Sequence, residues 1–241
     1  MKNPLKKKTP SSILKKSEKK TLHSTKTSLV GGIAKKLGID NKFHKFQEDI
    51  IIHDPNFIIS PVDAKLVACG DIKKDGKIIS KSKKEICLSE IIGDQAEIFS
   101  GGFYLNFYLS PNNRHYWRMP YDGEIISMTL NEGKTKFPVI IGLDKYFKNK
   151  DSFKKAIIKN ANIGMVYKSD KFYFSMIPVG SLNVNGIHIV DEKNGNYKKG
   201  DIGGYFSIGS SMLLCFPKNK LEVLLKIGDK VKIGQNIIKI N

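Results

Sequence analysis

The chain has 241 residues and a formal net charge of +18 at pH 7. Its hydrophobic content of 40% argues against global disorder, and its length suffices for one large domain with a substantial core. The three cysteines are odd in number and lack CxxC spacing. They exclude a disulfide framework and a zinc site of the usual kind, and they indicate packed thiols in a reducing compartment.

The N-terminal arm, residues 1–42, carries much of the positive charge. Residues 1–36 contain eleven lysines and one acid, Glu18, so this stretch alone contributes +10. Such a stretch is expected to be disordered and to attract polyanions, either nucleic acid or an anionic membrane surface. The chain has no zinc-finger, RRM or KH signature, so its positive charge is the only feature that favours nucleic-acid binding. We therefore do not expect the protein to bind nucleic acid.

No stretch of the sequence approaches the roughly 18–20 apolar residues of a membrane-spanning helix. The N-terminal lysines are not followed by an apolar segment, so we do not expect a secretory signal. If the protein acts on lipid, we expect it to act from the membrane surface.

From Phe43 onward the pattern is mainly that of β-strands. The stretch "NFIISPVDAKLVACGDI" predicts two short strands broken at Ser60-Pro61, and alternating runs such as "FYLNFYL" suit a half-buried sheet. Further strands are predicted at 103–109, 123–133, 163–168, 171–180 and 204–216, a hairpin at 224–237, and a short amphipathic helix within 143–160. We therefore predict a β-rich α+β fold over residues 43–241, with strands and hairpins in a compact sandwich-like or barrel-like core and few short helices.

Three polar islands interrupt these apolar strands: "SPVDAK" at 60–65, "YLSPNNRHYWRMPYDGEI" at 108–125 and "YFSIGSS" at 205–211. Together they supply a carboxylate, an imidazole, a guanidinium and a hydroxyl. A serine nucleophile needs a base within hydrogen-bond reach and a group that orients the base. The candidates are Ser210 or Ser211 as nucleophile, His115 as base and Asp63 as the orienting group.

Each candidate has a purely structural alternative. Asp63 suits a turn, a lone histidine such as His115 is more often structural than catalytic, and the serines suit a turn before a buried strand. Arg118 is either a surface charge or an anchor for a phosphate or carboxylate. No GxSxG motif is present, which excludes a conventional α/β-hydrolase.

The islands, taken in order, resemble motifs of the phosphatidylserine decarboxylase proenzyme family. "SPVDAKLVACGDI" is similar to that family's S-P-x-D-G segment, and "FYLSPNNRHYWRMPYDGEI" to its Y-L-S-P-x-D-Y-H-R-x-H-x-P-x-x-G segment. "IPVGSLNVNGI" resembles its V-G-A-x-N-V-G-S-I strand, and "KKGDIGGYFSIGSSMLLCF" the stretch with its L-G-S-T or G-S-S processing site. The resemblance covers about 43–241 and leaves the arm outside.

The resemblance implies a pyruvoyl enzyme made by self-cleavage between Gly209 and Ser210. Ser210 would attack the Gly209 carbonyl and, after β-elimination and hydrolysis, become the pyruvoyl cofactor at the start of a small chain, 210–241. The pyruvoyl group then serves as the electron sink for loss of CO2. His115 would protonate the resulting carbanion. Arg118 and Ser211 are assigned to substrate binding.

The sequence departs from the family pattern in two respects. Longer members have a second histidine, their base for self-cleavage, where this chain has Arg118, which cannot act as a base at ordinary pH. A shorter branch reads H-x-N-R-x-P at this point, and on that pattern His115 takes the base role, oriented by Asp63. The second departure is Ala64 in place of glycine, together with Asn113 where aspartate is frequent.

The first functional hypothesis is a self-processing decarboxylase that converts phosphatidylserine to phosphatidylethanolamine and CO2. It would act as a peripheral membrane protein on the cytoplasmic side, on an anionic phospholipid surface. The alternative is a non-catalytic, decarboxylase-like lipid-binding protein that has lost processing. A cleaved small chain held only by noncovalent contacts suggests a tightly packed particle, with a homodimer as one form.

Overall fold

The computed structural model describes residues 21–24 (backbone only), 49, 51, 53–79, 85–110, 112–133, 157–180, 186–190, 194–206, 210–218 and 220–241. Most of the arm, most of the predicted helix within 143–160, and Gly209 lie outside these residues. Inside the arm, β1 (Thr21–Ser24) pairs with β11 (Ile187–Val190).

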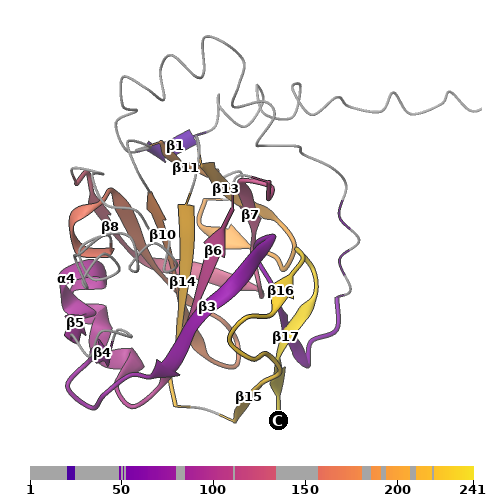
Figure 1. Cartoon of the computed structure of the whole chain (residues 1–241), viewed down its shortest axis with the longest axis horizontal. Coiled ribbons are helices and arrows are strands. Elements are labelled where there is room, and N and C mark those ends of the chain that lie inside the picture. The colour runs from indigo at the N-terminus through magenta and orange to yellow at the C-terminus, as the bar shows by residue number, and fades with distance from the viewer. Residues whose placement is uncertain are drawn as a thin grey trace, which may run out of the picture.

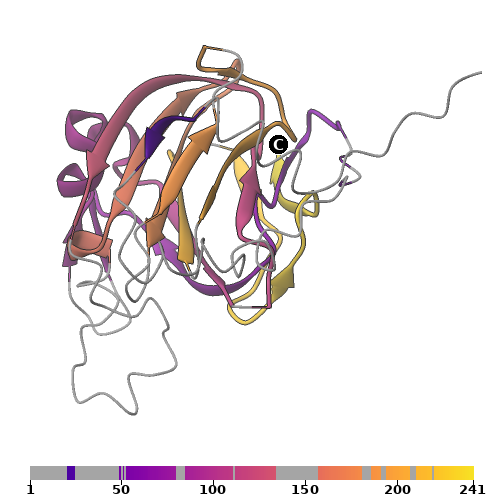
Figure 2. The same ribbon diagram turned by 90° about the horizontal axis from the view of Figure 1, so that it is seen from above.

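An antiparallel sheet of eight strands forms the centre of the fold (Figure 1). Its strands lie in the order β12 (Asn196–Tyr197), β8 (Gly123–Asn131), β9 (Asn162–Lys168), β10 (Tyr173–Gly180), β14 (Ser210–Phe216), β6 (Phe103–Leu109), β3 (Ala64–Asp71) and β16 (Lys230–Val231). The sheet curves strongly when seen from above (Figure 2). The expected β-rich α+β fold with few short helices is confirmed.

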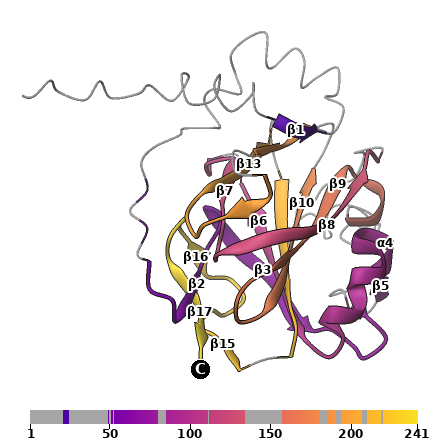
Figure 3. The same cartoon turned by 180° about the vertical axis from the view of Figure 1, so that it is seen from behind.

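Smaller sheets complete the structure. One contains β1, β11, β13 (Ile202–Phe206) and β7 (Tyr116–Arg118); another contains β15 (Leu221–Val223), β17 (Asn236–Ile240) and β2 (Phe57–Ile59). A hairpin of β4 (Lys77–Ile79) and β5 (Glu85–Cys87) precedes α4 (Ser89–Ile92) and the 3-10 helix η1 (Gly93–Phe99). Figures 1 and 3 place β7 and β13 across the end of the eight-stranded sheet at which β14 begins.

The two faces of the eight-stranded sheet bury different cores. Met212 and Leu214 of β14 belong to the larger core, which also contains Trp117, Ile58 and Ile238 from the smaller sheets. The intervening residues of β14, beginning with Leu213, belong to the second core, beneath α4 and η1. This division follows from the alternation of side chains along a strand.

Helix α4 packs very closely against β9. A Cβ atom at Gly164 of β9 would lie only 2.3 Å from the carbonyl oxygen of Ile91, so only glycine permits this contact. Figure 1 shows α4, β4 and β5 on one side of the molecule and β15, β16 and β17 on the other. Among the described residues, no helix is both long and apolar enough to cross a bilayer.

Candidate active site

The two candidate serines open the central strand β14 and face opposite cores. Ser210 lies between Leu109 and Gly180 of the neighbouring strands, and its side chain shares the face of the larger core; Ser211 points to the second core. Both residues are fully buried, and neither hydroxyl has a hydrogen-bond partner among the described residues. A buried hydroxyl without a partner costs about 1–3 kcal/mol, so each of the two serines calls for an explanation, and a reactive role is one such explanation.

His115 is also fully buried and lies just before β7. Its Nδ1 atom is 2.8 Å from the carbonyl oxygen of Asn113, and its own carbonyl accepts the backbone N–H of Phe206 at 2.8 Å. A carbonyl oxygen only accepts hydrogen bonds, so Nδ1 must carry the proton and Nε2 is left as the basic nitrogen of the neutral ring. The Asn113 carbonyl thus fixes the tautomer that a general base requires.

Asn113 closes the turn that places His115 after β6. Its backbone N–H donates to the Ser110 carbonyl at 2.9 Å, and its side-chain oxygen accepts the backbone N–H of Ser110 at 3.1 Å and contacts the Ser110 hydroxyl. A side-chain amide oxygen performs this capping role as well as a carboxylate does. The departure from aspartate at this position therefore leaves the local turn intact.

The sequence predicts that Asp63 orients His115, whereas the structure pairs Asp63 with Arg114. Arg114 donates from Nε to Oδ2 at 2.5 Å and from Nη2 to Oδ1 at 2.7 Å, and the backbone N–H of Ile233 donates to Oδ1 at 2.9 Å. The guanidinium presents two parallel donors that match both carboxylate oxygens, which explains the preference. Burial alone would raise the pKa of Asp63, but the hydrogen bonds from Arg114 and Ile233 outweigh burial and hold that pKa below its ordinary value.

Arg118 is engaged within the protein rather than open to a substrate anion. Its Nε donates to Asp49 at 2.6 Å and its Nη1 to the Gly200 carbonyl at 2.8 Å. The same Asp49 carboxylate accepts the Tyr116 hydroxyl at 2.8 Å and contacts Arg114. Two arginines and two carboxylates thus form a neutral buried cluster, which lowers the cost of burying each charge.

Sequence reasoning missed Arg114, Tyr116 and Asp49. The sequence pattern could have indicated Arg114 and Tyr116, because they alternate with His115 and Trp117. Alternate residues of an extended segment share one side, so Arg114 and Tyr116 lie on the same side as Arg118. No sequence pattern indicated Asp49, because it binds Arg118, which lies 69 positions later in the chain.

A second residue without a sequence signal is Asn106 of β6. It is fully buried opposite Leu213, and neither atom of its amide has a hydrogen-bond partner among the described residues. Its position opposite Leu213 places it on the same face of the sheet as Ser211, one strand away. The polar environment behind β14 therefore includes Asn106 as well as the second serine.

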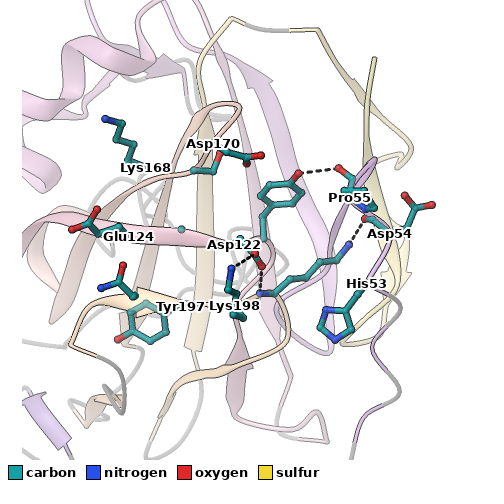
Figure 4. A pocket seen from close by; sticks show the side chains of 14 residues that line it. His53, Asp54, Pro55, Asp122, Glu124, Lys168, Asp170, Tyr197 and Lys198 are labelled. Atoms are coloured by element: carbon teal, nitrogen blue, oxygen red, sulfur yellow. Dashed lines mark hydrogen bonds and ion pairs between the residues drawn. The ribbon is translucent and has the colours of Figure 1, made fainter.

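A cleft of about 660 Å³ lies at the other end of the sheet, beside Glu124 of β8 and Lys168 of β9 (Figure 4). Along β10, seven residues, or roughly 23 Å, separate the Ser210 end from this end. At its exposed rim Lys198 Nζ donates to Asp122 at 2.8 Å. Deeper in the cleft, buried Lys199 donates to two backbone carbonyls. Burial lowers the pKa of Lys199. This cleft is separate from the candidate active site.

Comparison with known proteins places the chain in a family. The phosphatidylserine decarboxylase family model matches residues 42–239. The chain is similar to the phosphatidylserine decarboxylase proenzymes of Bacillus thuringiensis (strain Al Hakam) and Bacillus cereus (strain 03BB102), with 29% identity over 188 residues, covering 76% of this chain and 68% of each relative. The match includes every candidate residue from Asp63 to Ser211. The chain therefore belongs to the phosphatidylserine decarboxylase family of carboxy-lyases.

Proposed function

We propose that the chain is a self-processing, pyruvoyl-dependent decarboxylase that converts phosphatidylserine to phosphatidylethanolamine and CO2 at a membrane surface. The observation that carries this proposal is the fully buried Ser210 hydroxyl at the start of β14, with no hydrogen-bond partner among the described residues. The peripheral, cytoplasmic-side location and the attraction of the lysine-rich arm to anionic lipid are parts of the same proposal.

Self-cleavage uses the chain's own groups. His115 Nε2 takes the proton of the Ser210 hydroxyl, whose oxygen attacks the Gly209 carbonyl carbon. The peptide C–N bond then breaks and His115 returns the proton to the Ser210 nitrogen, so an ester and a free amine replace the amide. Removal of the Ser210 Cα proton expels the Gly209 carboxylate and leaves dehydroalanine. Water then replaces its nitrogen, which departs as ammonia, and a pyruvoyl group remains at the N-terminus of the small chain.

The residues present fit a pyruvoyl group at position 210. Position 210 lies between Leu109 and Gly180 at the start of a fully buried strand, so the group would lie in an environment of low polarity. The group supplies an electron sink for loss of CO2 from the amine-bearing substrate carbon. His115, with Nε2 as its basic nitrogen, is the residue to move protons there.

The small chain, residues 210–241, is expected to stay bound after the cut. Its first strand, β14, lies between β10 and β6, and its later strands pair with β3 and β2. All seven residues of β14 are buried. Dissociation would expose this strand, which makes noncovalent retention favourable.

The first test is the state of the purified protein. We expect two bands on a denaturing gel, the smaller one with 241 − 210 + 1 = 32 residues, a blocked N-terminus and a mass shift with carbonyl-trapping reagents. The two chains should coelute in native size-exclusion chromatography, where light scattering tests for a homodimer. One intact chain after prolonged incubation with membranes would contradict the proposal.

An intact chain would favour the alternative, a lipid-binding relative that has lost processing. One observation supports that alternative: Arg114 occupies both oxygens of Asp63, and Asp49 occupies Arg118, so neither residue is arranged as a partner for a catalytic histidine. The gel and the carbonyl reagent separate the two functions directly.

Replacing His115 with alanine tests the base. General-base catalysis is worth about 10²–10⁴-fold, so we expect self-cleavage at least about a hundredfold slower, measured as appearance of the small chain with time. Added imidazole should restore part of the rate, because it fills the space left by the ring. The control is His53→Ala, since His53 is exposed beside the distant cleft and should not affect cleavage. Normal cleavage of His115→Ala would assign the base elsewhere.

A further inference from the structure

The segment that links β15 to β16 exposes apolar side chains at outward positions. Leu221, Val223 and Leu225 pack against the larger core, so the residues between them face outward. Leu224 is 45% exposed and Ile227 is 51% exposed, more than any other large hydrophobic side chain of the described residues. These two side chains lie within four residues of each other, and packing in the core accounts for neither of them.

The turn that carries Ile227 is held in a defined conformation. The backbone N–H of Asp229 donates to the Lys226 carbonyl at 3.0 Å, and the Lys226 N–H donates to the Asp229 carboxylate at 2.8 Å. Gly228 has a φ of 108° and donates its N–H to the Leu66 carbonyl at 2.8 Å. Ile227 is therefore presented to solvent by a fixed turn, so its exposure does not come from a disordered loop.

Lysines flank the turn that carries Ile227, at the edge of the eight-stranded sheet. Lys230 of β16 stands directly opposite Lys65 of β3, and both are exposed. Like charges in this arrangement destabilise a sheet unless an anion lies nearby. Lys226 lies in the turn, and Lys232, 77% exposed, follows β16 on the same side as Lys230.

We infer that this surface docks on an anionic phospholipid bilayer, with the apolar side chains entering the headgroup region and the lysines contacting lipid phosphates. The hairpin predicted at 224–237 does not form, because β16 pairs with β3 and not with another strand of this segment. We call the docking region the turn surface and define it by Lys65, Leu224, Lys226, Ile227, Lys230 and Lys232. Apolar side chains flanked by lysines are complementary to an anionic bilayer, whereas nucleic acid would leave the apolar ones without partners. The exposed carboxylates at its border, those of Glu222 and Asp229, are half as many as its lysines.

The turn surface borders the buried ion pair of Asp63 and Arg114, and Arg114 immediately precedes His115 in the chain. The Lys232 ammonium lies 3.7 Å from Asp63, and the next residue, Ile233, donates its backbone N–H to the same carboxylate. Lys232 is the fifth residue after Ile227, which corresponds to at most about 17 Å of extended chain. This inference rests on the proposed function for its biological meaning, since docking here would bring a lipid substrate to the site.

The test is co-sedimentation of the full-length protein with vesicles of equal parts phosphatidylglycerol and phosphatidylcholine, which contain no substrate. The double variant Leu224→Ser/Ile227→Ser should bind at least tenfold more weakly. Lys226→Gln/Lys230→Gln should lose about fivefold per lysine, and the loss should diminish as salt increases. The matched control is the double variant Ile79→Ser/Leu130→Ser. The two side chains that it removes are 43% and 44% exposed and lie away from β15–β17, so this variant should bind vesicles as the unaltered protein does.

Unchanged binding of the Leu224→Ser/Ile227→Ser variant would overturn the inference and assign membrane attraction to the lysine-rich arm. An equal loss in the control variant would also overturn it. Processing, and decarboxylation of detergent-dispersed phosphatidylserine, are measured separately on the same variants. If no sample decarboxylates but the turn-surface variants still lose vesicle binding, the docking surface is supported while the proposed function fails.

Discussion

The variant Ser210→Ala should remain a single chain of 241 residues with no reactive carbonyl. Alanine has no hydroxyl to attack the Gly209 carbonyl and no leaving group for β-elimination, so both steps of self-cleavage are lost. The expected effect is complete, and no small chain should form on prolonged incubation. Denaturing gels and intact mass measure this result.

Failure to fold would not explain that result. The Ser210 hydroxyl is buried, with no hydrogen-bond partner among the described residues, so removing it removes a desolvated polar group and should leave the melting temperature equal or higher. The matched control is Ser211→Ala, which has the same burial but faces the second core, and it should still be cleaved. Cleavage of Ser210→Ala would exclude Ser210 as the nucleophile.

The strands could be predicted from the sequence because their pattern is local. Alternating or apolar runs correspond to β6 and β10, and the break at Ser60-Pro61 separates β2 from β3. The order of the strands could not be predicted. Strand β14 lies between β10 and β6, and β6 precedes it by about a hundred residues, a pairing that depends on side-chain packing across the whole sheet.

The residues of the candidate site could be predicted from the sequence, but their contacts could not. Motif resemblance selected Ser210 and His115, and the structure buries both. The group that orients His115 was missed because it is the Asn113 carbonyl, and a backbone carbonyl is present at every residue and gives no sequence signal. The pairing of Asp63 with Arg114 was missed because it joins residues 51 positions apart, and the resemblance assigned Asp63 to the histidine.

Replacing Arg114 with methionine tests whether the ion pair of Asp63 and Arg114 stabilises the fold. Arg114 is 8% exposed and Asp63 is 3% exposed, and removing one partner of a buried ion pair costs about 3–5 kcal/mol. We expect a loss of that size in the free energy of unfolding at pH 7, measured by urea denaturation. The control is Lys232→Met, which removes a largely exposed lysine 3.7 Å from the same carboxylate and should cost at most about 1 kcal/mol.

The pH dependence of this loss gives a second, independent readout. In the folded, unaltered protein the pKa of Asp63 lies below its ordinary value, so the ionised Asp63 carboxylate stabilises the fold. This stabilisation is complete above the pKa of an aspartate in the unfolded chain, about 3.9, and is lost as the pH falls through the pKa of Asp63 in the folded protein. Without Arg114, fewer hydrogen bonds oppose the effect of burial, so the pKa of Asp63 in the folded variant must rise. As the pH falls, the folded variant therefore binds more protons than the folded unaltered protein. The stability difference between the two proteins should therefore shrink on acidification.

Self-cleavage of the folded Arg114→Met variant then separates a structural from a catalytic role for Asp63. If the Asn113 carbonyl is what orients His115, the variant should still produce the small chain under conditions in which it is folded. A folded variant that is not cleaved would mean that the ion pair also positions the reacting groups. A loss of stability as small as that of Lys232→Met would contradict the structural role, because a buried carboxylate cannot lose its only bidentate partner among the described residues at so little cost.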